Sequence, residues 1–326
     1  MHKTCMLTAS VAMALSLGPP PAVAQSRLNP VISLLEARQP VFGLYAPANR
    51  RARPGAEAPP ADSVKSADQL AADALAYRQS DYIFDGTMEG NFDSGYSFFT
   101  GFASGVSRAR AQVGAKGASL VAPLFVKTPG IAENPALAKE RIGKQLDLGV
   151  SGIVFVDVES ADELRTGIAA MRFAFNGGTR TESVGDAPAR WGLSAPDYRQ
   201  KADVWPLNKH GELLNFAIVE SKEGLKNVRA IAAVPGIGVL FPGAGTLRGV
   251  FTNTDASGQR VFDENAWEAS IQQVLAACKE FNVPCGYPAG AADIEMRMAQ
   301  GFSVFVIGWG EPGFKAVELG RAKAGR

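Results

Sequence analysis

Short apolar runs alternate with segments of helical pattern along most of the chain. Eight runs are strand-like: 41–47, 81–87, 120–126, 152–158, 214–220, 237–243, 284–288 and 302–309. Each run is followed by a segment whose apolar residues recur at helical spacing. The runs are continuously apolar instead of alternating, which indicates strands buried on both faces, as in a parallel sheet.

These successive strand–helix units predict the fold class. Over about 280 residues they fit an α/β protein of the (β/α)8 TIM-barrel type better than an open doubly wound sheet. Two connections are longer than the regular alternation of strands and helices requires. Residues 48–64 form a proline- and arginine-rich insert after the first strand, and residues 176–210 form a long insert between the fourth and fifth strands. We expect the second insert to serve either function or assembly.

The chain begins with a segment typical of a secretory signal. A basic start precedes an apolar run over 6–17, and residues 22–24, Ala-Val-Ala, form a small-x-small cleavage pattern. The apolar run is too short to span ~30 Å of hydrocarbon. We therefore expect a signal peptide over 1–24, a single barrel domain over 25–326, and a mature protein that is periplasmic or secreted.

Composition and charge exclude some partners. The 326 residues are 46% hydrophobic, with 33 basic and 32 acidic side chains. This composition is globular, and its charge balance indicates neither a nucleic-acid partner nor an anionic membrane surface.

If the protein is exported, its cysteines could form a disulfide, because disulfides persist outside the cytoplasm. Removal of the signal leaves Cys278 and Cys285, separated by a predicted helix end and the start of the next strand. Such a turn could bring the Cα atoms within about 7 Å, as a disulfide requires. We favour the simpler interpretation of two buried thiols that pack as small apolar side chains.

In a TIM barrel, the chemistry lies where the strands end. The expected strand ends carry five acids and one lysine: Asp85, Glu89, Lys127, Asp157, Glu159 and Glu220. Carboxylates and a lysine around one mouth suit a divalent cation and an anionic substrate. An acid after a strand can also simply cap the next helix, and we favour that interpretation for Asp157 and Glu159. Glu220 is the strongest functional candidate, followed by Lys127 and Glu89.

Taken together, these residues resemble the HpcH/HpaI aldolase/citrate lyase family of TIM-barrel carbon–carbon lyases. The resemblance runs from Asn29 to Trp309 and is carried by PLFVKTP (123–129), LDLGVSGIVFVDVESADEL (146–164), VESKEGLKNVRAIAAVPGIGVLFPG (219–243) and LAACKEFNVPCGYPAG (275–290). It implies that a Mg²⁺ or Mn²⁺ ion, held by a glutamate and an aspartate, binds a pyruvate-like 2-oxo acid as its enolate. It further implies a histidine–aspartate pair that moves protons and an arginine that stabilises the oxyanion.

The metal ligands that the resemblance implies are only half present. The metal glutamate matches Glu220, whereas the metal aspartate falls on Thr246. One carboxylate with a threonine is a weak ligand set for a hard cation that prefers several oxygen ligands. The resemblance thus predicts Mg²⁺ or Mn²⁺ at an altered site.

The catalytic residues are altered as well. The dyad aspartate matches Asp147 in LDLG, and the arginine falls on Lys127, which keeps the charge without the bidentate fork. No histidine occurs where the family has one, near 86–90, and Glu89 stands closest. His210 precedes the fifth strand, at the wrong end for catalysis. The expected catalytic residues are therefore Glu89, Lys127 and Asp147.

Three functions follow from this pattern. We favour an aldolase-like carbon–carbon lyase that acts on a 2-oxo acid or a related small carboxylate, with metal assistance at an altered site. The alternatives are an exported enzyme of another reaction type on the same barrel, and a barrel that binds a small carboxylate without turnover. We expect no membrane association after signal cleavage. We also expect a homo-oligomer, because family members commonly assemble through a C-terminal helix, here within 311–326.

Overall fold

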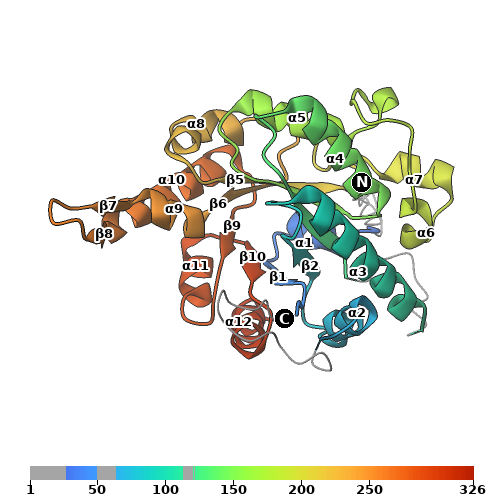
Figure 1. The fold of residues 1–326 in the computed structure, drawn as a ribbon, viewed down its shortest axis with the longest axis horizontal. Helices are drawn as coiled ribbons and strands as arrows, with labels where there is room; N and C mark the ends of the chain where they lie inside the picture. Colours follow the sequence, from blue (N-terminus) through green and yellow to red (C-terminus); the bar gives the residue numbers. More distant parts are fainter. Residues whose placement is uncertain (1–26, 50–63, 113–119, 121) are drawn as a thin grey trace, which may run out of the picture.

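The computed structural model describes residues 27–49, 64–112, 120 and 122–326. Its centre is one sheet of eight strands in the order β6-β5-β4-β3-β2-β1-β10-β9 (Figure 1). All neighbouring strands in it are parallel. A backbone bridge between Leu240 and Cys285 joins the two ends of this order, so the sheet closes into a barrel. The predicted TIM-barrel fold is confirmed.

The barrel strands agree with the expected runs. They are β1 Val41–Tyr45, β2 Tyr82–Asp85, β3 Leu124–Thr128, β4 Gly152–Phe155, β5 Leu214–Val219, β6 Val239–Pro242, β9 Gly286–Pro288 and β10 Val304–Ile307. The third strand begins at Leu124 and not at Leu120: Ala122 has a positive φ of 51°, which lies outside the β region, and the Leu120 N–H bonds to the carbonyl oxygen of Leu28 at 2.7 Å. That bond pairs Leu120 with the segment before the first helix.

Helices surround the strands, as Figure 1 shows. They are α1 Pro30–Glu36, α2 Ala67–Ala76, α3 Phe92–Gln112, α4 Pro135–Asp147, α5 Ala161–Met171, α8 Lys222–Ala232, α9 Ala244–Val250, α10 Glu264–Phe281, α11 Ile294–Gln300 and α12 Glu311–Lys323. Within the described ranges, none of these helices combines the length and apolar character needed to span a bilayer. The C-terminal helix α12 buries Ala316 and Val317 against its own barrel.

Aromatic side chains fill the interior of the barrel. Ideal Cβ atoms placed on Gly43, Gly152 and Gly286 would lie 2.1, 2.0 and 2.1 Å from the rings of Tyr82, Phe125 and Phe241, respectively. Each strand glycine therefore makes room for a ring from the neighbouring strand. Because the interior is packed, ligands can reach the barrel only at its two ends.

The long insert packs on the outside of the barrel. Residues 176–210 contain the short helices α6 Ala187–Trp191 and α7 Ala195–Lys201. The Trp191 indole Nε1–H donates to the carbonyl oxygen of Gly149 at 2.8 Å, which fixes α6 beside the end of α4. The other predicted insert falls largely on residues 50–63, and the expected signal peptide on 1–24. Both lie outside the described residues.

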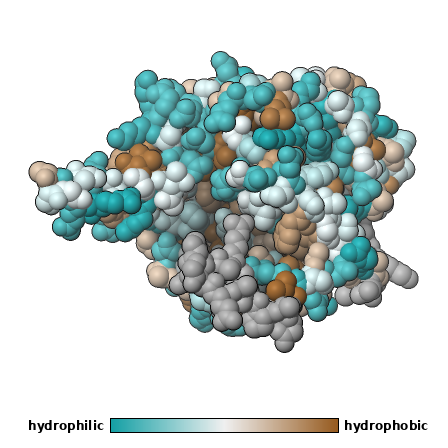
Figure 2. Space-filling view, in the orientation of Figure 1, coloured by the Kyte–Doolittle hydropathy of each residue, from teal (hydrophilic) through white to brown (hydrophobic). Residues whose placement is uncertain are grey.

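One element was not predicted from the sequence. Strands β7 Thr252–Thr254 and β8 Arg260–Phe262 form an antiparallel hairpin between α9 and α10. The hairpin extends away from the barrel (Figures 1 and 2). The Asp255 carboxylate closes its turn by accepting bonds from the backbone N–H groups of Ser257 and Gln259. Each of these strands has only three residues, and only β8 contains apolar side chains, so no apolar run marks the hairpin.

The preference for two free thiols is wrong. Cys278, in the last turn of α10, and Cys285, just before β9, form a disulfide with their Cα atoms 5.6 Å apart. Asn282 ends α10 in the left-handed conformation, with φ of 53°. This residue turns the chain back toward the helix, and the reversal brings the two cysteines within bonding distance.

Candidate active site

An ion pair occupies the mouth formed by the C-terminal ends of the strands. Side chains alternate along a strand, so Lys127 points to the same inner side as the buried ring of Phe125. Its Nζ atom lies 3.0 and 2.9 Å from Oε1 and Oε2 of Glu89, in the turn after β2. The Lys127 side chain is 15% exposed and that of Glu89 39%. Both groups are accessible to a ligand.

Asp85 holds the turn that carries Glu89. It is buried at the end of β2, and its Oδ1 accepts bonds from the N–H and the hydroxyl of Thr87. Burial raises the pKa of the Asp85 carboxyl, and the two bonds from Thr87 oppose that shift. Asp85 thus positions the turn after β2 and does not face the open mouth.

Glu220 comes directly after β5 and points inward, as Ile218 does two residues earlier. Its Oε1 accepts the backbone N–H of Asp157 at 3.0 Å, which ties the ends of β4 and β5 together. The side chain is 8% exposed. Asp157 has a positive φ of 49°, and this conformation directs its N–H toward Glu220.

Tyr45 is a member of this mouth that the sequence analysis missed. It ends β1 on the inner side, and its ring packs edge-on against Phe84 with the centroids 4.8 Å apart. Burial raises the pKa of the Tyr45 phenol, Lys127 lowers it, and Glu89, Asp85 and Glu220 raise it further. One hydroxyl is therefore within electrostatic reach of all four charged side chains. The position of Tyr45 at a strand end could have identified it as a site residue from the sequence. It was not identified because only charged side chains at strand ends were considered as candidates.

Ser160, and not Glu159, caps the following helix α5, whereas Glu159 supports the scaffold at α8. Its Oε1 accepts the hydroxyl of Ser221 at 2.6 Å, and Ser221 is the N-cap of α8. The Asp157 carboxylate is exposed, and partial burial raises its pKa, with a further contribution from Glu159.

The structure does not bring Asp147 to the ion pair at the mouth. Asp147 is the last residue of α4, two positions after Gln145, whose amide donates to the backbone oxygen of Lys127 at 2.9 Å. Two positions turn a helix by about 200°, so Asp147 points away from β3. Its carboxylate instead binds Arg180 at 3.0 Å and the hydroxyl of Ser183 at 2.5 Å, both in the long insert.

Thr246 and His210 are both exposed. Thr246 lies in the first turn of α9, close in sequence to Gly243, which contacts Glu220. His210 precedes β5 and so lies toward the opposite end of the barrel, as expected.

The side chains at the mouth do not fit a complete metal site. One carboxylate oxygen of Glu220 already accepts a hydrogen bond from the Asp157 N–H, and Thr246 adds only a neutral hydroxyl as a possible metal ligand. In the part of the chain that the structure describes, no three His, Cys, Asp or Glu side chains are grouped to hold a metal ion. The positive charge at this mouth is supplied by Lys127.

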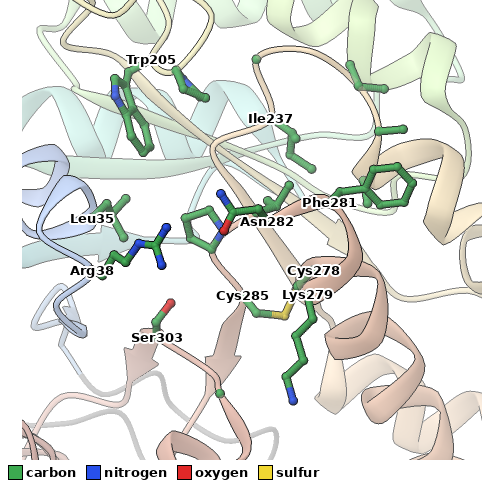
Figure 3. A pocket seen from close by; sticks show the side chains of 18 of the residues that line it. Leu35, Arg38, Trp205, Ile237, Cys278, Lys279, Phe281, Asn282, Cys285 and Ser303 are labelled. Carbon is green, nitrogen blue, oxygen red and sulfur yellow. A yellow bond between two sulfur atoms is a disulfide. The ribbon is translucent and has the colours of Figure 1, made fainter.

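A basin of about 770 Å³ lies at the other end of the barrel. Its walls include Gln39, Ile237 and Ser303, all of which precede barrel strands. Figure 3 shows Trp205 and Arg38 beside it and the disulfide in its wall. Among the described residues that line it, Glu36 is the only carboxylate, and it is bonded to Arg27. The basin can therefore bind an anion, but it has no free acid–base pair.

Comparison with known proteins shows which family this chain is similar to. Residues 106–304 match HpcH/HpaI aldolase/citrate lyase. A hydroxypyruvate/pyruvate aldolase of Chromohalobacter salexigens is 31% identical over 199 residues, which cover 61% of this chain and 70% of that protein. A 2-keto-3-deoxy-L-rhamnonate aldolase of Salmonella schwarzengrund is 26% identical over 163 residues, which cover 50% of this chain and 55% of that protein.

A solved structure extends the comparison to the fold. An HpcH/HpaI aldolase/citrate lyase family protein of Burkholderia cenocepacia superposes with a TM-score of 0.61 at 23% identity, covering 90% of this chain and 96% of that one. The sequence match spans more than half of the chain, and the barrel is shared nearly end to end. This chain belongs to the HpcH/HpaI aldolase/citrate lyase family.

Proposed function

We propose that this protein is an aldolase-like carbon–carbon lyase that cleaves a 4-hydroxy-2-oxo acid or a related small carboxylate. The observation that carries the proposal is the mouth itself, where Lys127 meets Glu89 and Glu220 approaches from β5. A cation paired with one carboxylate, with a second carboxylate at the same mouth, can bind a negatively charged substrate and also exchange protons with it. Aldolases among the relatives support the same reaction class.

The roles follow from charge and accessibility. Lys127 binds the oxygen atoms of the 2-oxo acid group. Glu89, which is the more exposed partner, moves the proton that the family assigns to a histidine. A positioned base of this kind contributes ~10²–10⁴-fold to the rate. Glu220 supports the ends of β4 and β5 and lines the same mouth.

Metal assistance is a separate question. The family resemblance implies a divalent metal ion, and the CitE protein of Mycobacterium tuberculosis, which shares the fold, has been solved in complex with magnesium and acetate. A Mg²⁺ or Mn²⁺ ion at Glu220 stays a prediction for this chain, because the second acidic ligand is replaced by Thr246.

Pyruvate release tests the proposal. Wild-type protein, incubated with a panel of 4-hydroxy-2-oxo acids, should release pyruvate, measured by coupling to lactate dehydrogenase. Lys127→Met and Glu89→Gln should each reduce the rate by at least ~10²-fold. Lys226→Met, on the exposed face of α8, is the matched control and should keep the wild-type rate. Absence of pyruvate across the panel would reject the lyase.

The basin favours a second candidate function, the binding of a small carboxylate without turnover. Arg38 and Lys279 contribute positive charge to its walls, and Leu35, Trp205 and Ile237 contribute apolar surface. The volume is within the range of small-molecule sites, roughly 300–1,000 Å³. Carboxylates that raise the melting temperature of the wild type but not of Arg38→Ala, with no product formed, would support this function over the lyase.

We also propose that the mature protein is exported and forms a homo-oligomer. The signal-like pattern over 1–24 and the Cys278–Cys285 disulfide support export. N-terminal sequencing of protein recovered from the periplasm or medium tests cleavage after Ala24. Light scattering at micromolar concentration tests assembly, and a monomeric mass would reject it. Deletion of the β7–β8 hairpin shows whether that projecting element contributes to assembly.

A further inference from the structure

Lys127 has an unusual position for a basic side chain in this fold. Among the described strands of the barrel, it is the only basic residue. Its side chain points inward above the ring of Phe125 and reaches an accessible mouth. An ideal Cβ atom on Gly86 would lie 3.6 Å from Lys127 Cδ and 3.7 Å from Tyr45 Cε1, so these side chains border the same space.

Its base partner is already in place. Both carboxylate oxygens of Glu89 lie within 3.0 Å of Nζ, so a proton can pass between the two groups without movement of the backbone. The Gln145 amide holds the Lys127 carbonyl at 2.9 Å, and Asp85 holds the turn that carries Glu89. The amine and its base are therefore each held by a contact from a separate element, α4 for Lys127 and the end of β2 for Glu89.

We propose that Lys127 is a covalent catalyst that forms an imine with the C2 carbonyl of the 2-oxo acid, with Glu89 as the proton-transferring partner. The inference rests on the proposed lyase function and adds its chemical route. An amine can attack a carbonyl, whereas a guanidinium stays protonated and cannot. The route needs no divalent metal, which agrees with the incomplete ligand set around Glu220.

Lys127 and Glu89 together supply and take up all the protons that imine formation requires. Glu89 accepts a proton from the Lys127 ammonium, and the free Nζ electron pair attacks C2 while the carbonyl π electrons move to oxygen. Glu89 relays one proton from nitrogen to that oxygen and gives a second to the resulting hydroxyl. Water leaves, the nitrogen electron pair forms the C=N bond, and Glu89 is again a carboxylate beside a positively charged iminium.

Cleavage uses the same two groups. Glu89 removes the proton of the C4 hydroxyl, and the oxygen electrons form the product aldehyde as the C3–C4 bond breaks. The electrons of that bond form C2=C3, and the C=N π electrons move to nitrogen to give a neutral enamine. Glu89 returns the proton to C3, and water hydrolyses the iminium to pyruvate and the Lys127 ammonium.

Borohydride trapping tests this route in the full-length mature protein. Wild-type protein with pyruvate, borohydride and excess EDTA should gain the mass of one reduced pyruvyl group. Peptide mapping should place that group on Lys127. Lys127→Arg keeps the charge and should gain no such mass, whereas Lys226→Arg, on the exposed face of α8, should be trapped as the wild type is. Glu89→Gln should slow trapping by ~10²-fold or more while its circular dichroism stays native.

The outcomes separate the inference from the function on which it rests. Pyruvate release without an adduct on Lys127 would overturn the imine and leave the lyase standing. An adduct on Lys127 without cleavage of any 4-hydroxy-2-oxo acid would keep the imine and reject the lyase. Equal labelling of several lysines, or neither adduct nor cleavage, would overturn the inference.

Discussion

Glu220 occupies the space that the absence of a side chain on Gly243 leaves. An ideal Cβ atom on Gly243 would lie 2.4 Å from Glu220 Cβ and 2.6 Å from its Oε2. Real Cβ atoms do not approach so closely, so the packing of β5 against the turn after β6 depends on glycine at this position. The turn after β6 thus restricts where the Glu220 carboxylate can lie.

Gly243→Ala should therefore displace Glu220. Overpacking of this kind costs about 1–3 kcal/mol of stability, and the displaced carboxylate should lower pyruvate release. The matched control is Gly245→Ala, two residues further along, where an added Cβ would meet nothing within 4 Å. Urea unfolding and the coupled assay measure both effects. Equal behaviour of the two variants would contradict the role given to Gly243.

Thr246→Asp should supply the second acidic metal ligand that the family resemblance implies beside Glu220. The change adds a carboxylate in the first turn of α9, where negative charge is also favoured by the helix dipole. Mn²⁺ affinity, measured by calorimetry, should rise in Thr246→Asp and disappear when Glu220→Ala is added. Tight Mn²⁺ binding by the wild type that Glu220→Ala does not change would show that other carboxylates matter.

Asp147→Ala should affect stability more than catalysis. Arg180 is fully buried, and its charge is balanced by Asp147, with additional contacts to the Tyr198 hydroxyl and the Phe173 ring. Loss of the carboxylate should cost about 3 kcal/mol in the free energy of unfolding, because a buried guanidinium loses its counter-charge. The kcat of the folded variant should stay near that of the wild type. A collapse of kcat with unchanged stability would instead support the dyad role that the family resemblance implies.

Removal of the disulfide should weaken the fold. The double variant Cys278→Ala, Cys285→Ala opens a short loop, for which the chain-entropy model predicts a loss of about 2 kcal/mol. Reduction of the wild type should shift its thermal unfolding to a similar degree, and the variant itself should not respond to reductant. An unchanged melting temperature in both cases would show that the bridge contributes nothing.

The free energy of unfolding should fall in acid, because protonation of Glu268 breaks its ion pair with Arg297. Two bonds from Arg297, at 2.6 and 2.7 Å, hold the pKa of the Glu268 carboxyl below its usual value, and partial burial opposes this shift. Because the folded-state pKa is the lower one, the stabilisation is present above the ordinary value of about 4.3 and is lost as the pH falls through the folded-state pKa. The difference in urea midpoint between wild type and Glu268→Gln should therefore shrink in acid. A constant difference would contradict the linkage.

Periodicity by itself determined the architecture of this protein. Continuous apolar runs separated by helical segments specify a parallel sheet with helices outside, because burial on both faces leaves no other arrangement for such strands. Once the barrel is known, its strand ends identify Lys127, Glu89 and Glu220, since these positions depend only on where each run stops.

Only the tertiary structure decided which of these groups meet. The bidentate pairing of Lys127 with Glu89 depends on the turn that Asp85 holds, and the Cys278–Cys285 bridge depends on the left-handed conformation of Asn282. Asp147 matched a family motif, yet its neighbours come from an insert whose path no local pattern predicts. Periodicity reflects burial, which is local in sequence, whereas the partners of a charged side chain are set by the packing of segments far apart in the chain.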